Sequence, residues 1–112
     1  MVKKISLPIK NKRYEKLTEI KKPEILGAGL AIAEIIKTER HIHKKTTAYY
    51  FVISGAGLIE VGKKKIKVKK NDLIEIKPKT VHRAYALKKP FVVLFITKPA
   101  FQKKDYFKIE TK

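Results

Sequence analysis

Cysteine is absent from the 112-residue chain, and glycine and proline are scarce, at five residues each. Without cysteine there is no disulfide, no thiolate metal ligand and no cysteine nucleophile, so any bound metal must be held by histidine or carboxylate. Long apolar runs are absent too. No stretch approaches the roughly 18 apolar residues of a membrane span, and residues 1–8 lack the apolar segment of a signal peptide. We therefore expect a soluble, cytoplasmic protein that does not enter a membrane.

Acidic residues are few, because 10 Asp and Glu stand against 28 Lys and Arg, which gives a formal net charge of +18. Nearly all the basic residues are lysines, dispersed along the chain in short runs. Such a charge could attract the phosphate backbone of nucleic acids, or it could form a solvated surface of the kind seen in thermophiles. Interleaved aromatics and an arginine fork for phosphate are missing, so we expect any nucleic-acid binding to be weak and nonspecific.

Hydrophobic residues make up 44% of the chain, enough for one domain with a buried core. They fall in short runs rich in Ile, Val, Tyr and Phe, which is typical of β-strands. A tight turn at residues 61–64, followed by strict alternation in 65–69, predicts a hairpin, and Asn71-Asp72 predicts a second turn. The candidate strands are residues 25–36 (with a possible break at Gly27 and Gly29), 46–53, 57–61, 64–68, 73–76, 82–87 and 91–97.

These strands predict an all-β fold, an antiparallel sandwich or barrel, because no segment forms a helix long enough to connect parallel strands. We expect an N-terminal segment over residues 1–24 and a β-barrel with a C-terminal tail over residues 25–112. Within the first region, residues 14–20 could form a helical turn or an edge strand before Pro23.

The three histidines are the main candidates for chemistry. His41 and His43 are two residues apart in a strand pattern, so their side chains share one face. Two imidazoles on one face can bind the same metal ion, because neutral imidazole is a common donor to divalent transition metals. By itself a His-x-His step is a weak motif, and an exposed or capping role is the alternative.

In their order along the chain these residues resemble the two motifs of the cupin family. The first motif, a His-x-His pair, a glutamate and a glycine, corresponds to His41-Ile42-His43, Ala48 and Gly55. The second motif, a turn, an apolar strand, another turn and a histidine, corresponds to residues 71–82. The resemblance covers residues 29–101.

The resemblance implies a double-stranded β-helix, or jelly roll. It also implies that His41, His43 and His82, which fall on the family's ligand positions, together bind one divalent transition metal. Three imidazoles accept iron, nickel, zinc, copper or manganese, so the identity of the metal stays open.

The sequence departs from the cupin motifs at four positions. Ala48 stands where the family usually has its glutamate ligand, Asn71 and Lys79 replace glycines, and Ala86 replaces a later asparagine. Loss of the glutamate leaves a neutral three-histidine site with open coordination positions, which suits an anionic bidentate substrate. Three-histidine sites also occur in cupin-like iron dioxygenases, so the resemblance implies this activity as an alternative function.

In a barrel with inward-facing ligands, alternation places a largely apolar set of side chains beside the histidines. Tyr50 in this set could orient a substrate through its hydroxyl, or it could simply fill the barrel. Arg83 and Tyr85 alternate outward and could lie in a subunit interface. The expected inward positions are 48, 50 and 52 and, with His82, residues 74, 76, 80 and 84.

Charged residues near the motifs have two interpretations each. Glu34, within an apolar strand pattern, could replace the lost ligand or act as a general base, or it could face solvent. The lysines at 44, 45, 77 and 79 flank the motif turns. They could steer an anion toward the site or serve solubility alone.

The function we expect is a metal-dependent enzyme that acts on a small anionic metabolite, such as a sugar or keto acid, at His41, His43 and His82. Three alternatives remain open: a noncatalytic cupin that binds a metal or small ligand, a three-histidine iron dioxygenase, and a basic protein that binds nucleic acid nonspecifically. We also expect a homodimer, because barrels of this size commonly cover an edge by pairing with a second copy.

Overall fold

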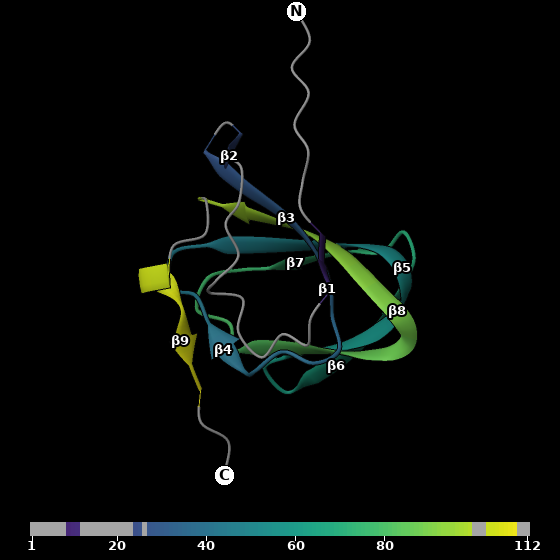
Figure 1. Ribbon diagram of the computed structural model, residues 1–112. Coiled ribbons are helices and arrows are strands. Elements are labelled where there is room, and N and C mark those ends of the chain that lie inside the picture. The colour runs from purple at the N-terminus through teal and green to yellow at the C-terminus, as the bar shows by residue number, and fades with distance from the viewer. Residues whose placement is uncertain (1–8, 12–23, 26, 100–102, 110–112) are drawn as a thin grey trace, which may run out of the picture.

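The structure, a computed structural model, describes the backbone of residues 9–11, 24–25, 27–99 and 103–109. It confirms the all-β prediction (Figure 1). Within the described residues, no helix is long and apolar enough to cross a membrane. The elements are β1 (Ile9–Asn11), β2 (Glu24–Ile25), β3 (Ala28–Glu34), β4 (His41–Ile42), β5 (Thr47–Val61), β6 (Lys64–Lys69), β7 (Leu73–Ile76), β8 (His82–Lys98), the 3₁₀ turn η1 (Lys103–Asp105) and β9 (Phe107–Lys108).

Two long antiparallel strands, β5 and β8, form the centre of the fold and curve together through it (Figure 1). The sequence analysis divided each of them into two strands, and that division is wrong. The register of the pair shifts three times between Val52 and Gly57, so these positions are bulges at which the strands bend and continue. Gly55 has a φ of +73° and lies against the carbonyl oxygens of Lys88 and Pro90, where a Cβ has no room.

The remaining strands join this pair. β8 also pairs with β3 and with β4, while β5 pairs with β6 and β7. The predicted hairpin is confirmed by the β5–β6 register, which closes at Val61 opposite Lys64. The predicted turn at Asn71 is confirmed by its left-handed φ of +77°. Among the described strands the pairing does not close into a continuous barrel, and the architecture is that of a double-stranded β-helix.

The N-terminal segment contributes a short strand, because β1 pairs in parallel with β3 and places Ile9 opposite Ile32. The prediction of a helical turn or edge strand at residues 14–20 lies outside the described residues. On β3 burial alternates, with Ala31 and Ala33 buried and Glu34 on the opposite face. Ile35, which directly follows the strand, is buried as well.

The core fills the space between the strands with side chains that alternate inward, as the period of two requires. The buried cluster consists of Ala31, Ala33, Ile35, Ala48, Tyr50, Val52, Ile59, Val68, Ile76, Ala84, Phe91, Val93 and Phe95. The histidines lie where β4 meets the start of β8, next to this cluster.

Candidate metal centre

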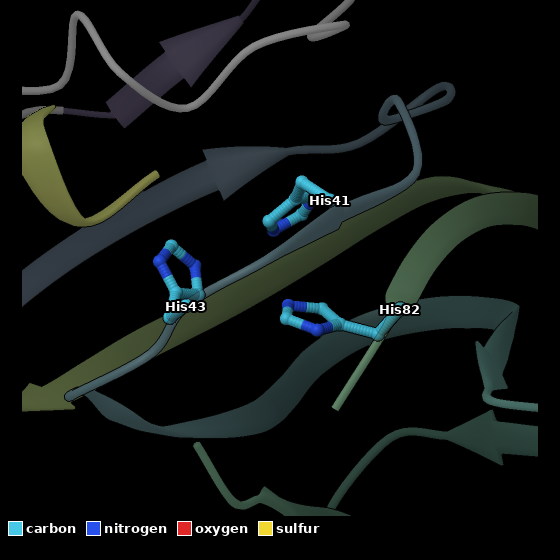
Figure 2. A group of neighbouring side chains, drawn as sticks. All are labelled: His41, His43 and His82. Atoms are coloured by element: carbon cyan, nitrogen blue, oxygen red, sulfur yellow. The ribbon is translucent and has the colours of Figure 1, made fainter. Parts of the chain in front are cut away.

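The structure brings the three histidines together. His41 in β4 is the direct antiparallel partner of His82 at the start of β8, and His43 follows two residues after His41. Figure 2 shows the three rings directed toward a shared space. One ring nitrogen from each histidine lies within 4.8 Å of the others, and the side chains are buried, with at most 5% of any residue exposed.

Backbone carbonyl groups fix the orientation of every ring. The Nδ1 atoms of His41, His43 and His82 lie 2.7, 2.8 and 2.9 Å from the carbonyl oxygens of residues 39, 105 and 80. A carbonyl oxygen only accepts a hydrogen bond, so each Nδ1 carries the proton and donates. Each Nε2 is then left with a lone pair available to bind an ion.

Two of these Nε2 atoms are buried and unsatisfied. Within the described part of the chain, the buried Nε2 atoms of His41 and His82 have no hydrogen-bond partner. A buried acceptor without a partner costs roughly 1–3 kcal/mol. An ion between the rings would remove this cost. The two unsatisfied nitrogens therefore favour metal binding independently of any sequence motif.

The electrostatics of the site keep the His41 and His82 rings neutral. The pKa of His41 is lowered from 6.5 to about 2, mainly by burial and in addition by the positive charge that His82 would carry. Burial likewise lowers the pKa of His82 to about 4, with a smaller contribution from His43. Neutral imidazole is the form that binds metals. Three nitrogen donors without a carboxylate fit a divalent transition metal and do not fit Mg²⁺ or Ca²⁺, which prefer oxygen.

Two residues at the site were missed by the sequence analysis. Tyr106 stacks on the His41 ring, with the centroids 4.7 Å apart, and its hydroxyl donates a hydrogen bond of 2.7 Å to the Glu39 carboxylate. Asp105 precedes it and is buried against the loop that follows His43. No local sequence pattern relates Asp105 to residues about 60 positions earlier in the chain, so the sequence alone does not single it out.

The expected inward positions on β5 are buried. Ala48 and Tyr50 are each 2% exposed. The Tyr50 ring lies edge-on to His82, with a centroid distance of 6.2 Å, and packs against Phe95. Burial raises the pKa of the Tyr50 hydroxyl, so it is protonated at neutral pH. It is therefore a hydrogen-bond donor close to the histidines.

The outward positions also agree with the predicted alternation. Arg83 and Tyr85 lie on the face opposite His82 and Ala84, and the Arg83 guanidinium donates to Glu60. Glu34 lies on the outer face of β3 and is not part of the histidine cluster, so it does not replace the missing glutamate ligand.

Comparisons with known proteins agree with this geometry. Residues 33–97 match the cupin domain family. An uncharacterized protein of Methanocaldococcus jannaschii is 31% identical over 96 residues, which are 80% of this chain and 77% of that protein. A nucleoside dehydratase from Streptomyces has a similar fold, with a TM-score of 0.71 and 17% identity over 79% of this chain and 72% of that one. A double-stranded β-helix protein from Klebsiella pneumoniae has a TM-score of 0.67 and 19% identity over 80% of each chain. The chain belongs to the cupin family.

Proposed function

We propose that His41, His43 and His82 bind one divalent transition metal through their Nε2 atoms, and that this centre acts on a small anionic metabolite such as a sugar or keto acid. The observation that carries the proposal is the set of three Nδ1 contacts to backbone carbonyls, which directs three neutral donors toward one point. When bound, the ion would supply Lewis-acid polarisation or, if it is redox-active, electron transfer.

The preference for an anion follows from the charge of the site. Three neutral imidazoles leave the full charge of a divalent ion in place, and Ala48 offers no carboxylate to reduce it. The low dielectric of a buried site strengthens the attraction for a negatively charged ligand. A bidentate acid would therefore bind more tightly here than at a site with a carboxylate ligand.

Lysines around the loops that hold His43 add to this attraction. Lys44 and Lys45 directly follow His43 and are exposed. The backbone N–H of Lys79 donates a hydrogen bond of 2.6 Å to the carbonyl oxygen of His43, so the turn that carries Lys77 and Lys79 lies against this loop. We propose that these four side chains guide an anion toward the centre.

Tyr50 is the proposed substrate-binding residue. Its hydroxyl stays protonated because of burial, and its ring lies beside His82. A donor in this position would orient a ligand oxygen or stabilise negative charge that develops on it.

The test is elemental analysis of protein purified without a histidine tag, followed by removal of metal and titration with iron, manganese, nickel, copper and zinc. We expect one ion per chain in the wild type and loss of stoichiometric metal in each of the variants His41→Ala, His43→Ala and His82→Ala. Tyr49→Phe is the control, because it removes only an exposed hydrogen bond to Glu75. Full occupancy of the histidine variants in competition with a chelator would place the site elsewhere.

The identity of the metal decides which reaction to assay. Stoichiometric iron would direct the assays to oxygenation, the dioxygenase alternative, and zinc or nickel to reactions without electron transfer. A metal-loaded protein that binds small acids without turning any over would support the noncatalytic alternative.

A further inference from the structure

The Asp105 side chain binds the loop that follows His43. Its carboxylate accepts hydrogen bonds from three consecutive backbone N–H groups, at 2.9 Å from Lys44, 3.1 Å from Lys45 and 3.1 Å from Thr46. The residue is only 7% exposed. Burial by itself would raise the pKa of Asp105, but these donors outweigh it and hold the pKa below its usual value. The carboxylate is thus ionised and firmly attached to the loop.

The main chain of Asp105 binds the histidine itself. Its carbonyl oxygen is the acceptor for the Nδ1–H of His43, at 2.8 Å. The side chain of Asp105 therefore fixes the position of the backbone group that sets the tautomer and the orientation of the His43 ring.

The next residue acts in the same way on His41. The Tyr106 ring stacks on the His41 ring with an interplanar angle of 18°, and its hydroxyl bonds the carboxylate of Glu39. The carbonyl oxygen of Glu39 is in turn the acceptor for His41 Nδ1–H. Pairing of β9 with β4, where Lys108 lies opposite His41, holds the segment in place.

We propose that residues 103–109 are a positioning element of the metal centre, in which Asp105 orients His43 for metal binding and Tyr106 orients His41. The inference rests on the proposed metal site and deepens it. Two of the three ligands are oriented by a segment that begins about 60 residues later in the chain, and partners that orient ligands in this way typically contribute about 10–100-fold to metal affinity. Because coupling is reciprocal, metal binding also strengthens docking of the segment.

The decisive variant is Asp105→Asn. Its amide keeps the size of the side chain, but it retains a single acceptor oxygen and turns an NH₂ group toward N–H donors. We expect the affinity for cobalt(II), measured in competition with a chromogenic chelator, to fall about 10–100-fold. The visible spectrum of the bound cobalt should change as well, because the His43 donor is no longer held in the same geometry. A loss of stability alone would leave that spectrum unchanged.

Asp72→Asn is the matched control. Asp72 also accepts a backbone N–H, from Lys69 at 2.9 Å, but it lies in the turn between β6 and β7 and outside the histidine cluster. This variant should keep the affinity and the spectrum of the wild type. NMR of the metal-free proteins adds a second readout, because the His43 ring should be protonated at Nδ1 in the wild type and in the control but not uniformly so in Asp105→Asn.

The outcomes separate the two proposals. If the wild type binds no cobalt, the proposed function fails, and the positioning role fails with it. If the wild type binds cobalt and Asp105→Asn binds it with the same affinity and spectrum, the metal site stands and the positioning role is wrong. Should Asp105→Asn not fold, Tyr106→Leu decides, because it removes both the ring stack and the hydrogen bond to Glu39. It should weaken binding about tenfold, and unchanged binding would overturn the inference.

Discussion

Acid should destabilise the metal-stripped protein well before its carboxylates are protonated. Burial lowers the folded-state pKa of His41 to about 2 and that of His82 to about 4, whereas an unfolded histidine titrates near 6.5. Between pH 6.5 and 4 the unfolded chain therefore binds two protons that the folded chain does not. The free energy of unfolding then rises with pH in this window, so stability is lost as the pH falls.

The size of this loss follows from the two shifts. One group that titrates only in the unfolded state changes the free energy of unfolding by about 1.4 kcal/mol per pH unit. Two such groups over the two units from pH 6.5 to 4.5 give about 5 kcal/mol. Domains of this kind are stable by about 5–15 kcal/mol in total, so the metal-stripped protein should be close to unfolding at pH 4.5.

Urea denaturation in the presence of a chelator, at half-unit steps between pH 7 and pH 4.5, measures this dependence. The double variant His41→Gln/His82→Gln is the control. Because glutamine does not titrate, the stability of this variant should change much less over the window than that of the wild type. If the wild type loses less than about 1 kcal/mol, or if the double variant loses as much as the wild type, the two rings are not held neutral by burial.

Two further predictions concern β5. Ala48→Glu should tighten metal binding on the order of tenfold and weaken binding of a simple bidentate acid such as oxalate, because an added anionic ligand fills one coordination position and lowers the charge of the ion. Titrations of the wild type and of Ala48→Glu with the metal and with the acid measure these two changes. Identical binding by the two proteins would show that position 48 does not face the ion. Gly57→Ala should destabilise the protein by about 1–3 kcal/mol, because its methyl group would overlap the Phe91 ring. Urea denaturation measures this loss of stability. Part of it should be recovered in the double variant Gly57→Ala/Phe91→Leu, and unchanged stability of Gly57→Ala would contradict the close contact with Phe91.

Local sequence patterns predicted most of the sheet. Alternation after Gly62 specified the β5–β6 hairpin, and asparagine at position 71 specified a left-handed turn. The same local reasoning divided β5 and β8, because glycine, proline and paired lysines usually mark turns. In the folded chain the long-range pairing of the two strands continues through bulges at these residues. The continuity of each strand is therefore visible only from its pairing and not from its local sequence.

The site was predictable where its residues belong to a motif. His41, His43 and His82 were identified because a known pattern relates them, although the last of them is far away in the sequence. Asp105 and Tyr106 have no such pattern, and their contacts with the histidine loops form only when β9 pairs with β4. The homodimer expected from the outer strands stays a prediction, which light scattering in solution would test.

The position of β4 between β8 and β9 has a consequence for how the protein matures. The direct partners of His41 in these two strands are His82 and Lys108, which are synthesised long after it. A nascent chain on the ribosome thus lacks the third histidine of the cluster until residue 82 has been synthesised, and such distant pairings form late in folding. We expect the ion to be captured by an already folded protein rather than to guide its folding. Which metal is acquired would then depend on the ions available in the compartment where folding ends.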